Sequence, residues 1–82
     1  MNLYLISQTE NNTYDTFDSA VVCAPDVETA RNMDPSTGKP KTDWRRRYDD
    51  WASCPENVSV KYLGRASEEI EQGVVCASFN AG

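Results

Sequence analysis

The chain has 82 residues, 39% of them hydrophobic, which indicates one small folded domain, residues 1–82. Its formal net charge of −5 repels phosphate groups. It contains no histidine, the commonest general base of enzymes, and it has no glycine-rich phosphate loop, nucleophile elbow or metal-binding signature. These absences argue against catalysis and against a metal or other cofactor, and no apolar run approaches the roughly 20 residues that span a bilayer.

The first part of the chain predicts two strands and a short helix. Residues 3–6 form a short apolar run typical of a strand, and the polar stretch 8–18 indicates a long connection. Residues 19–24 predict a second strand, apolar enough to suggest burial on both faces. Asp26 is a good N-cap for a helix that ends before Pro35, because the residue before a proline is driven out of helical geometry.

Residues 43–51, DWRRRYDDW, predict a second helix. Trp44, Tyr48 and Trp51 recur at i, i+4 and i+7, so that all three share one helical face. Arginine and aspartate one turn apart can form ion pairs on the remaining surface. The pattern therefore favours an amphipathic helix that packs its aromatic side chains into the core.

The last third of the chain predicts two more strands. Val58, Val60 and Tyr62 alternate with polar residues, which is the signature of a half-exposed strand. Residues 66–72 suggest one further helical turn, and residues 74–79 form the last apolar run. The expected fold is α+β, with a small, largely antiparallel four-stranded sheet and two short helices packed on one face.

The three cysteines do not have the spacing of a zinc site. Cys23, Cys54 and Cys76 are far apart in the sequence, whereas structural zinc sites use close pairs of ligands. Cys23 and Cys76 stand in apolar runs, where a free cysteine behaves as a small buried hydrophobe. Core packing is the favoured interpretation of these two, and metal or redox duty is the alternative.

The distribution of charge predicts a protein-binding surface. Residues 1–30 carry acidic side chains and no lysine or arginine, and the polar connection adds two aromatic residues. Aromatic anchors within an acidic rim are typical of surfaces that bind a basic partner, although a merely solvated acidic surface is the alternative. The candidate protein-binding residues are Glu10, Tyr14, Asp15, Phe17, Asp18, Asp26 and Glu28.

The arginines of the second predicted helix offer a different function. Arg45, Arg46 and Arg47 lie beside tryptophan and tyrosine, a combination suited to phosphate contact and base stacking. Stacking would require exposed aromatic rings, and each ring contributes about 2–3 kcal/mol when it is buried instead. The sequence therefore argues against direct nucleic-acid binding, and a weak nucleic-acid-binding accessory protein is the alternative function.

The N-terminus lacks the basic region and long apolar run of a signal peptide, so that a cytoplasmic protein without a membrane partner is expected. An open edge strand would permit a weak dimer, and otherwise we expect a monomer.

Four segments resemble short uncharacterised proteins encoded by phages and prophages. They are residues 3–8, 14–22, 28–31 and 76–82. In size, acidity and its strand–helix–strand plan the chain is also similar in type to anti-CRISPR proteins, the small phage inhibitors of CRISPR–Cas complexes. The resemblance implies a protein-binding inhibitor that acts in the bacterial host cytoplasm. It would block a nucleic-acid-binding defence complex by occluding a lysine- and arginine-lined channel with an acidic surface.

Overall fold

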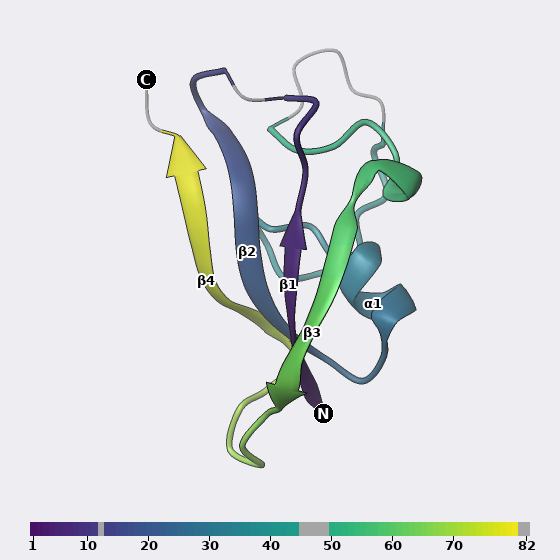
Figure 1. Ribbon diagram of the computed structural model, residues 1–82, viewed down its shortest axis with the longest axis vertical. Coiled ribbons are helices and arrows are strands. Elements are labelled where there is room, and N and C mark those ends of the chain that lie inside the picture. The colour runs from purple at the N-terminus through teal and green to yellow at the C-terminus, as the bar shows by residue number, and fades with distance from the viewer. Residues whose placement is uncertain (12, 45–49, 81–82) are drawn as a thin grey trace.

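A computed structural model describes residues 1–11, 13–44 and 50–80 as a four-stranded sheet with one covered face (Figure 1). The strands, in chain order, are β1 (Asn2–Ser7), β2 (Thr16–Ala24), β3 (Ser59–Arg65) and β4 (Gly73–Asn80). Their order across the sheet is β3-β1-β2-β4, and every neighbouring pair is antiparallel. The four expected strands and their antiparallel arrangement are confirmed.

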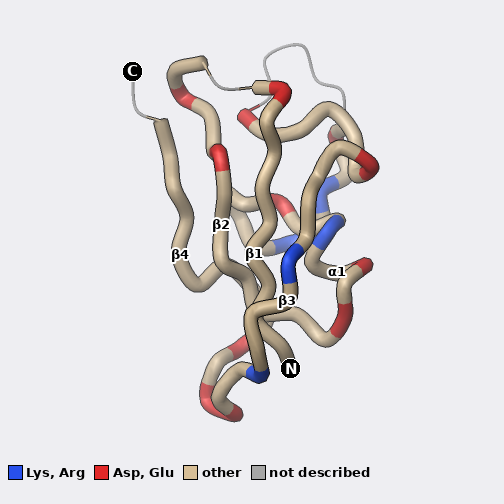
Figure 2. Tube along the Cα trace, in the orientation of Figure 1, with Lys and Arg blue, Asp and Glu red and all other residues tan. Residues whose placement is uncertain are grey.

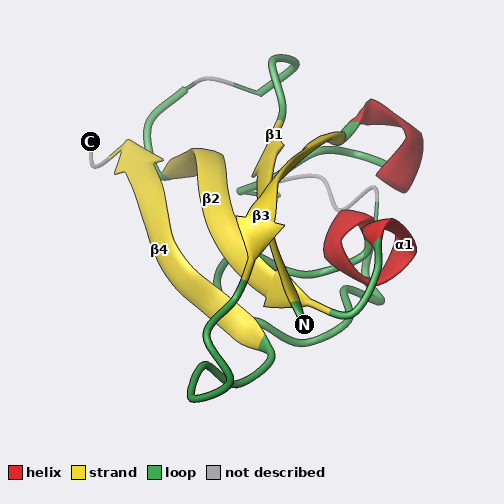
Figure 3. Ribbon diagram, turned by 60° about the horizontal axis from the view of Figure 1, so that its bottom comes forward, coloured by secondary structure: helices red, strands yellow, loops and turns green. Residues whose placement is uncertain are grey.

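The helix expected after Asp26 is present as α1 (Val27–Arg31). The Asp26 carboxylate accepts a hydrogen bond of 2.8 Å from the Thr29 backbone N–H, which satisfies a free donor of the first turn. Figure 3 shows α1 beside one face of the sheet. The only other helix among the described residues is a single 3₁₀ turn, η1 (Pro55–Asn57), and neither helix is long or apolar enough to cross a membrane.

The second expected α-helix is not confirmed. Most of it falls on residues 45–49, which lie outside the described residues. Trp44 and Trp51, at its expected ends, stand in a turn and a bend. Trp51 is nevertheless a core residue, and Trp44 packs against the core, as the aromatic pattern predicted for these two.

The helical turn expected at residues 66–72 is not present as a helix, and this segment joins the two edges of the sheet. β3 and β4 are the two edge strands, so the connection spans three strand spacings, about 14 Å. The segment forms a turn, in which Ser67 C=O accepts from Ile70 N–H at 3.0 Å.

The connection predicted for residues 8–18 is shorter than expected, because β2 begins at Thr16. Thr16 and Phe17 pair with Asn80 and Phe79 of β4, and the two phenylalanine rings lie 4.7 Å apart. Cross-strand aromatic contact of this kind stabilises the extended ladder, although the local sequence is polar.

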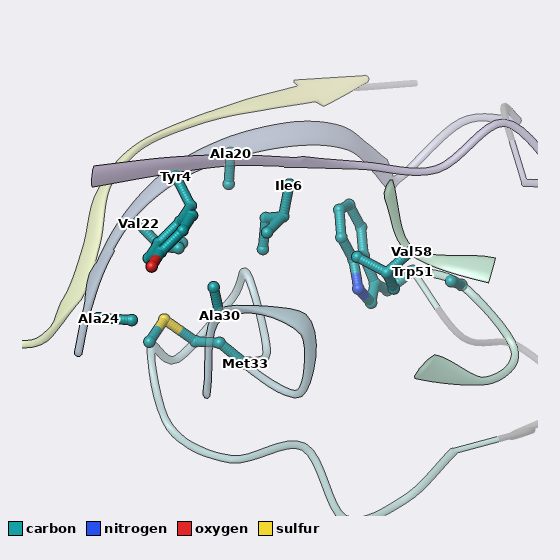
Figure 4. Close-up of a cluster of buried hydrophobic side chains, with 10 residues drawn as sticks. Tyr4, Ile6, Ala20, Val22, Ala24, Ala30, Met33, Trp51 and Val58 are labelled. Atoms are coloured by element: carbon teal, nitrogen blue, oxygen red, sulfur yellow. The ribbon is translucent and has the colours of Figure 1, made fainter. Parts of the chain in front are cut away.

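One face of the sheet carries the core. Tyr4 and Ile6 of β1 point toward α1 and the following loop, and Trp51 packs beside Ile6 and Val58 (Figure 4). Alanine side chains from the sheet and α1 allow these elements to approach closely. The buried core consists of Tyr4, Ile6, Ala20, Val22, Ala24, Ala30, Met33, Trp51, Ala52 and Val58.

The opposite face of the sheet is largely open, which corrects two expectations. Leu5 and Val21 are only half-buried there, so that β2 is not buried on both faces along its length. Cys76 pairs with Val21 and is exposed rather than packed in the core. Cys23 is buried as expected, because the turn at Ile70 covers it.

Candidate protein-binding surface

The acidic candidate residues do not form one surface. The nine-residue strand β2, about 30 Å long, separates Asp15 at its start from Asp26 beyond its end. Figure 2 shows acidic positions toward both ends of the molecule and several basic positions between them, beside α1 and β3. The connection between β1 and β2, with the start of β2, brings together Glu10, Tyr14, Asp15, Phe17 and Asp18. We call this group the hairpin end.

The hairpin end is fixed by Gln8, which sequence reasoning missed. The Gln8 side chain is buried, and its Nε2 donates to the carbonyls of Asn11 and Phe17 at 2.5 and 2.8 Å. Its Oε1 accepts from the Asn11 backbone N–H at 2.8 Å. The sequence does not indicate that this glutamine is buried, because its hydrogen-bond partners, Asn11 and Phe17, are brought to it only by the folded connection.

Tyr14 is the most prominent side chain of the hairpin end. It is 77% exposed, the largest value among the exposed large hydrophobic residues described. The turn around it is held by Thr16 Oγ1, which donates to Thr13 C=O at 2.6 Å, and by Asp15 N–H, which donates to Asn80 C=O. Asp15 has a φ of 60°, a left-handed conformation that aspartate tolerates. The turn therefore presents Tyr14 to solvent from a fixed backbone.

Phe17 has a structural position. It is half-buried, packs against the core, and contacts Phe79 of β4 with the rings tilted by 58°. Its backbone N–H also donates to Asp50 C=O at 2.8 Å. Phe17 therefore connects the hairpin end to the core and to β4, and its ring is less exposed to solvent than that of Tyr14.

Glu10 ties the hairpin end to the segment that precedes β3. Its carboxylate accepts from the Ser53 backbone N–H, from Ser53 Oγ at 3.1 Å and from Asn57 Nδ2 at 3.1 Å. The backbone N–H of Ser53 is the main reason that the pKa of Glu10 is lowered from its ordinary value of 4.5. Because these contacts occupy both oxygens, Glu10 is less available to a partner than its exposure suggests.

Glu10→Gln is expected to lower the free energy of unfolding by about 1 kcal/mol near neutral pH, a value reduced for solvent exposure. The glutamine oxygen can still accept from Ser53 N–H, but its NH₂ group cannot accept from the Asn57 amide. The lowered pKa means that the stabilisation is complete above pH 4.5 and disappears as the pH falls through the lowered value. Urea unfolding measured at several pH values tests this.

The matched control for Glu10→Gln is Glu69→Gln, which removes an exposed carboxylate from the β3–β4 connection. We expect it to change stability by less than about 0.5 kcal/mol. A deficit in Glu10→Gln that stays constant in acid would contradict the assignment of the loss to the ionised carboxylate.

Asp26 and Glu28, at the opposite end of the sheet, stabilise α1. The pKa of Asp26 is lowered by the hydrogen bond from the Thr29 backbone N–H. Glu28 lies 3.9 Å from Arg31 Nε in an i,i+3 ion pair. Arg31 Nη1 in turn donates to Val58 C=O at 2.6 Å and ties α1 to the residue before β3. Asp26 and Glu28 therefore have local structural roles, of which the Asp26 cap was predicted from the sequence.

The nucleic-acid-binding alternative depends on arginines that the structure does not describe. Arg45, Arg46 and Arg47, the candidates for that alternative, lie outside the described residues. Lys41 is buried, with its Nζ 3.2 Å from Asp43 and 3.9 Å from Asp34, and 5.6 Å from the centre of the Trp44 ring. Its charge is therefore directed inward rather than toward a ligand.

The open face of the sheet carries a shallow hollow of about 180 Å³. Apolar and small side chains line it, including Leu5, Val21 and Cys76, without a charged group. Among residues 1–11, 13–44 and 50–80, no cluster of three or more cysteine, aspartate or glutamate side chains could hold a metal ion. The arrangement around the hollow supplies no acid–base pair for catalysis.

Comparison with known proteins gives no further guide to the site, because no family model, curated protein or solved structure matches the chain at a significant level.

Proposed function

We propose that the chain is a non-enzymatic protein-binding inhibitor of phage origin, anti-CRISPR-like in type, that acts in the host cytoplasm. Its contact surface is the hairpin end, with Tyr14 as the anchor and Asp15 and Asp18 as acidic neighbours. The target is a basic surface of a nucleic-acid-binding host defence complex, which the inhibitor occludes.

The observation that carries the proposal is the 77% exposure of Tyr14 on a hydrogen-bonded turn. Tyrosine is enriched among the residues that dominate binding energy, because it buries a large area and loses few rotamers. A turn that is already fixed also lowers the entropy lost on binding. The resemblance of several segments to phage-encoded proteins supports the proposed origin.

The charge of the chain favours a basic protein surface over nucleic acid as the partner. The chain has a net charge of −5, and Asp15 and Asp18 stand within four residues of Tyr14. An acidic group beside an aromatic anchor accelerates association with a lysine- or arginine-rich surface and disfavours nucleic acid as the ligand. The proposed partner is therefore a protein surface that otherwise holds DNA or RNA.

The proposal is tested by purifying the tagged chain from bacteria that express CRISPR–Cas complexes and identifying bound subunits by mass spectrometry. We expect stoichiometric recovery of an effector subunit. The triple variant Tyr14→Ala, Asp15→Asn, Asp18→Asn is expected to reduce recovery by about tenfold or more, as loss of a dominant aromatic contact does. Asparagine is chosen at position 15 because it also tolerates the left-handed conformation.

The matched control changes the same residue types away from the hairpin end: Tyr62→Ala, Glu68→Gln, Glu69→Gln. Tyr62 is 56% exposed on β3, and both glutamates are exposed in the connection to β4. The control should retain the effector subunit. Equal losses in both triple variants, with native circular dichroism, would remove the hairpin end from the proposal. Recovery of no effector subunit by the wild-type chain would overturn the anti-CRISPR-like function.

A further inference from the structure

β4 leaves one edge of the sheet open. Among the described strands β4 pairs with β2 alone, so that half of its backbone N–H and C=O groups face away from the sheet (Figure 1). Val75 and Phe79 are 48% and 46% exposed, and the three residues between them are exposed as well. This edge is both apolar and available for pairing.

The two edges of the sheet differ in how they are protected. β3 carries Lys61 and Arg65, and the guanidinium of Arg31 caps the carbonyl of Val58 directly before it. Charged side chains of this kind oppose edge-to-edge association. Residues 72–80 contain no charged residue and no proline. β4 therefore lacks the features with which proteins commonly prevent the addition of a further strand.

We propose that β4 pairs antiparallel with β4 of a second copy of the chain, about a two-fold axis at Ala77, so that the two sheets become continuous. A strand run antiparallel against its own copy forms an isologous contact, in which each pair of residues occurs twice. The inference does not depend on the proposed function, although Phe79 of this edge contacts Phe17 of the hairpin end.

The position of the axis follows from the side chains along the edge. An axis at Ala77 sets Val75 opposite Phe79 of the second copy, and Cys76 opposite Ser78. Large side chains then meet large ones and small ones meet small ones, and pairs of an aromatic with a β-branched residue are favoured across strands.

A close contact lies at the start of β4, outside residues 75–79, which the proposed register pairs. Gly38 approaches so closely that a Cβ atom there would lie 3.1 Å from the backbone nitrogen of Val74. The free part of the strand therefore begins at Val75. Its usable length runs from there to Asn80, where the described strand ends.

A second copy suits this edge better than a charged partner. The strand offers no charge to attract one, and the side chains that it exposes are complementary to themselves. A contact through one short strand buries less than a standard interface, about 1,200–2,000 Å², so the dimer should be weak. The net charge of −5 on each copy adds repulsion, which salt will screen.

The test is sedimentation equilibrium of the wild type and of Val75→Lys over a range of protein concentrations. The wild-type mass is expected to rise toward twice that of the monomer, and Val75→Lys to remain monomeric. Val27→Lys is the matched control, because Val27 is 42% exposed on α1, and it should dimerise as the wild type does. A wild-type chain that stays monomeric throughout, or a Val75→Lys variant that dimerises equally, would overturn the proposal.

The register is tested by oxidative cross-linking in a Cys76→Ser background. Facing residues of an antiparallel pair have Cα atoms about 4.5–5.5 Å apart, a separation that a disulfide can bridge. Ala77→Cys should therefore cross-link two copies. Ser78→Cys should not, since Ser78 and its counterpart would be more than about 7 Å apart. Equal cross-linking of both variants would overturn the axis at Ala77.

Discussion

Trp51→Ala is expected to leave the domain close to unfolding. The side chain is 1% exposed and is the largest of the fully buried ones described, and it packs beside Ile6 and Val58 (Figure 4). Truncation of a buried tryptophan costs about 3–5 kcal/mol, whereas a domain of this size has a stability of about 4–12 kcal/mol. Urea unfolding followed by far-ultraviolet circular dichroism should show a correspondingly lower midpoint.

Trp51→Phe is the informative companion. Phenylalanine keeps most of the buried ring area, and it removes Nε1, a buried donor for which the described residues supply no hydrogen-bond acceptor. We expect the free energy of unfolding to fall by about 1–2 kcal/mol. The cost of the cavity left by the smaller ring is offset in part because the unsatisfied Nε1 donor is removed. Equal losses for the alanine and phenylalanine variants would contradict the assignment of the effect to packing.

The consequences of Trp51→Ala should extend to the hairpin end. Trp51 C=O accepts from Asn11 Nδ2 at 3.3 Å, and Asp50 C=O accepts from Phe17 N–H at 2.8 Å. The core residue and the connection between β1 and β2 are thus joined through the backbone. A truncation in the core is expected to loosen the turn that carries Tyr14, although the two lie on different elements.

The sequence predicted those features that depend on neighbours along the chain. A short apolar run identified β1, the alternation of apolar and polar residues identified β3, and the Asp26 cap identified the start of α1. These patterns are local, since one face of a strand and the first turn of a helix are set by residues a few positions apart.

The features that were missed depend on which strands become neighbours. Placing β3 and β4 at opposite edges makes residues 66–72 the connection between the two edge strands, and no residue in that segment indicates the order of strands in the sheet. The exposure of Cys76 has the same cause, because an apolar strand is buried only where another layer covers it.

The candidate site shows this limit most clearly. The sequence predicts that Asp15 and Asp26 share one acidic surface, but the strand between them places them at opposite ends of the sheet. A strand extends by about 3.3 Å per residue. Two acidic residues at the opposite ends of a long strand therefore cannot lie on one surface unless the chain reverses direction between them. Exposed Tyr14 was predictable from its polar surroundings, whereas the support from Gln8 was not.

Lys41→Met is expected to lower the free energy of unfolding by about 2 kcal/mol. The Lys41 side chain is 2% exposed, and its Nζ lies 3.9 Å from Asp34 and 3.2 Å from Asp43. Methionine preserves much of the apolar stem but leaves both carboxylates without this cation. Removal of one partner from a fully buried pair costs about 3–5 kcal/mol, and we expect less here because the aspartates retain access to water.

Lys39→Met provides the matched control, because Lys39 is exposed in the same loop, and it should change stability by less than about 0.5 kcal/mol. The loop is also held by its backbone, with Lys41 N–H donating to Asn32 C=O at 2.8 Å and Met33 bridged to Pro40. The loss in Lys41→Met therefore reports the side-chain charge rather than unravelling of the loop. A variant as stable as the wild type would mean that desolvation of the ammonium group cancels its attraction to the two aspartates, which is the outcome known for some buried pairs when apolar residues replace them.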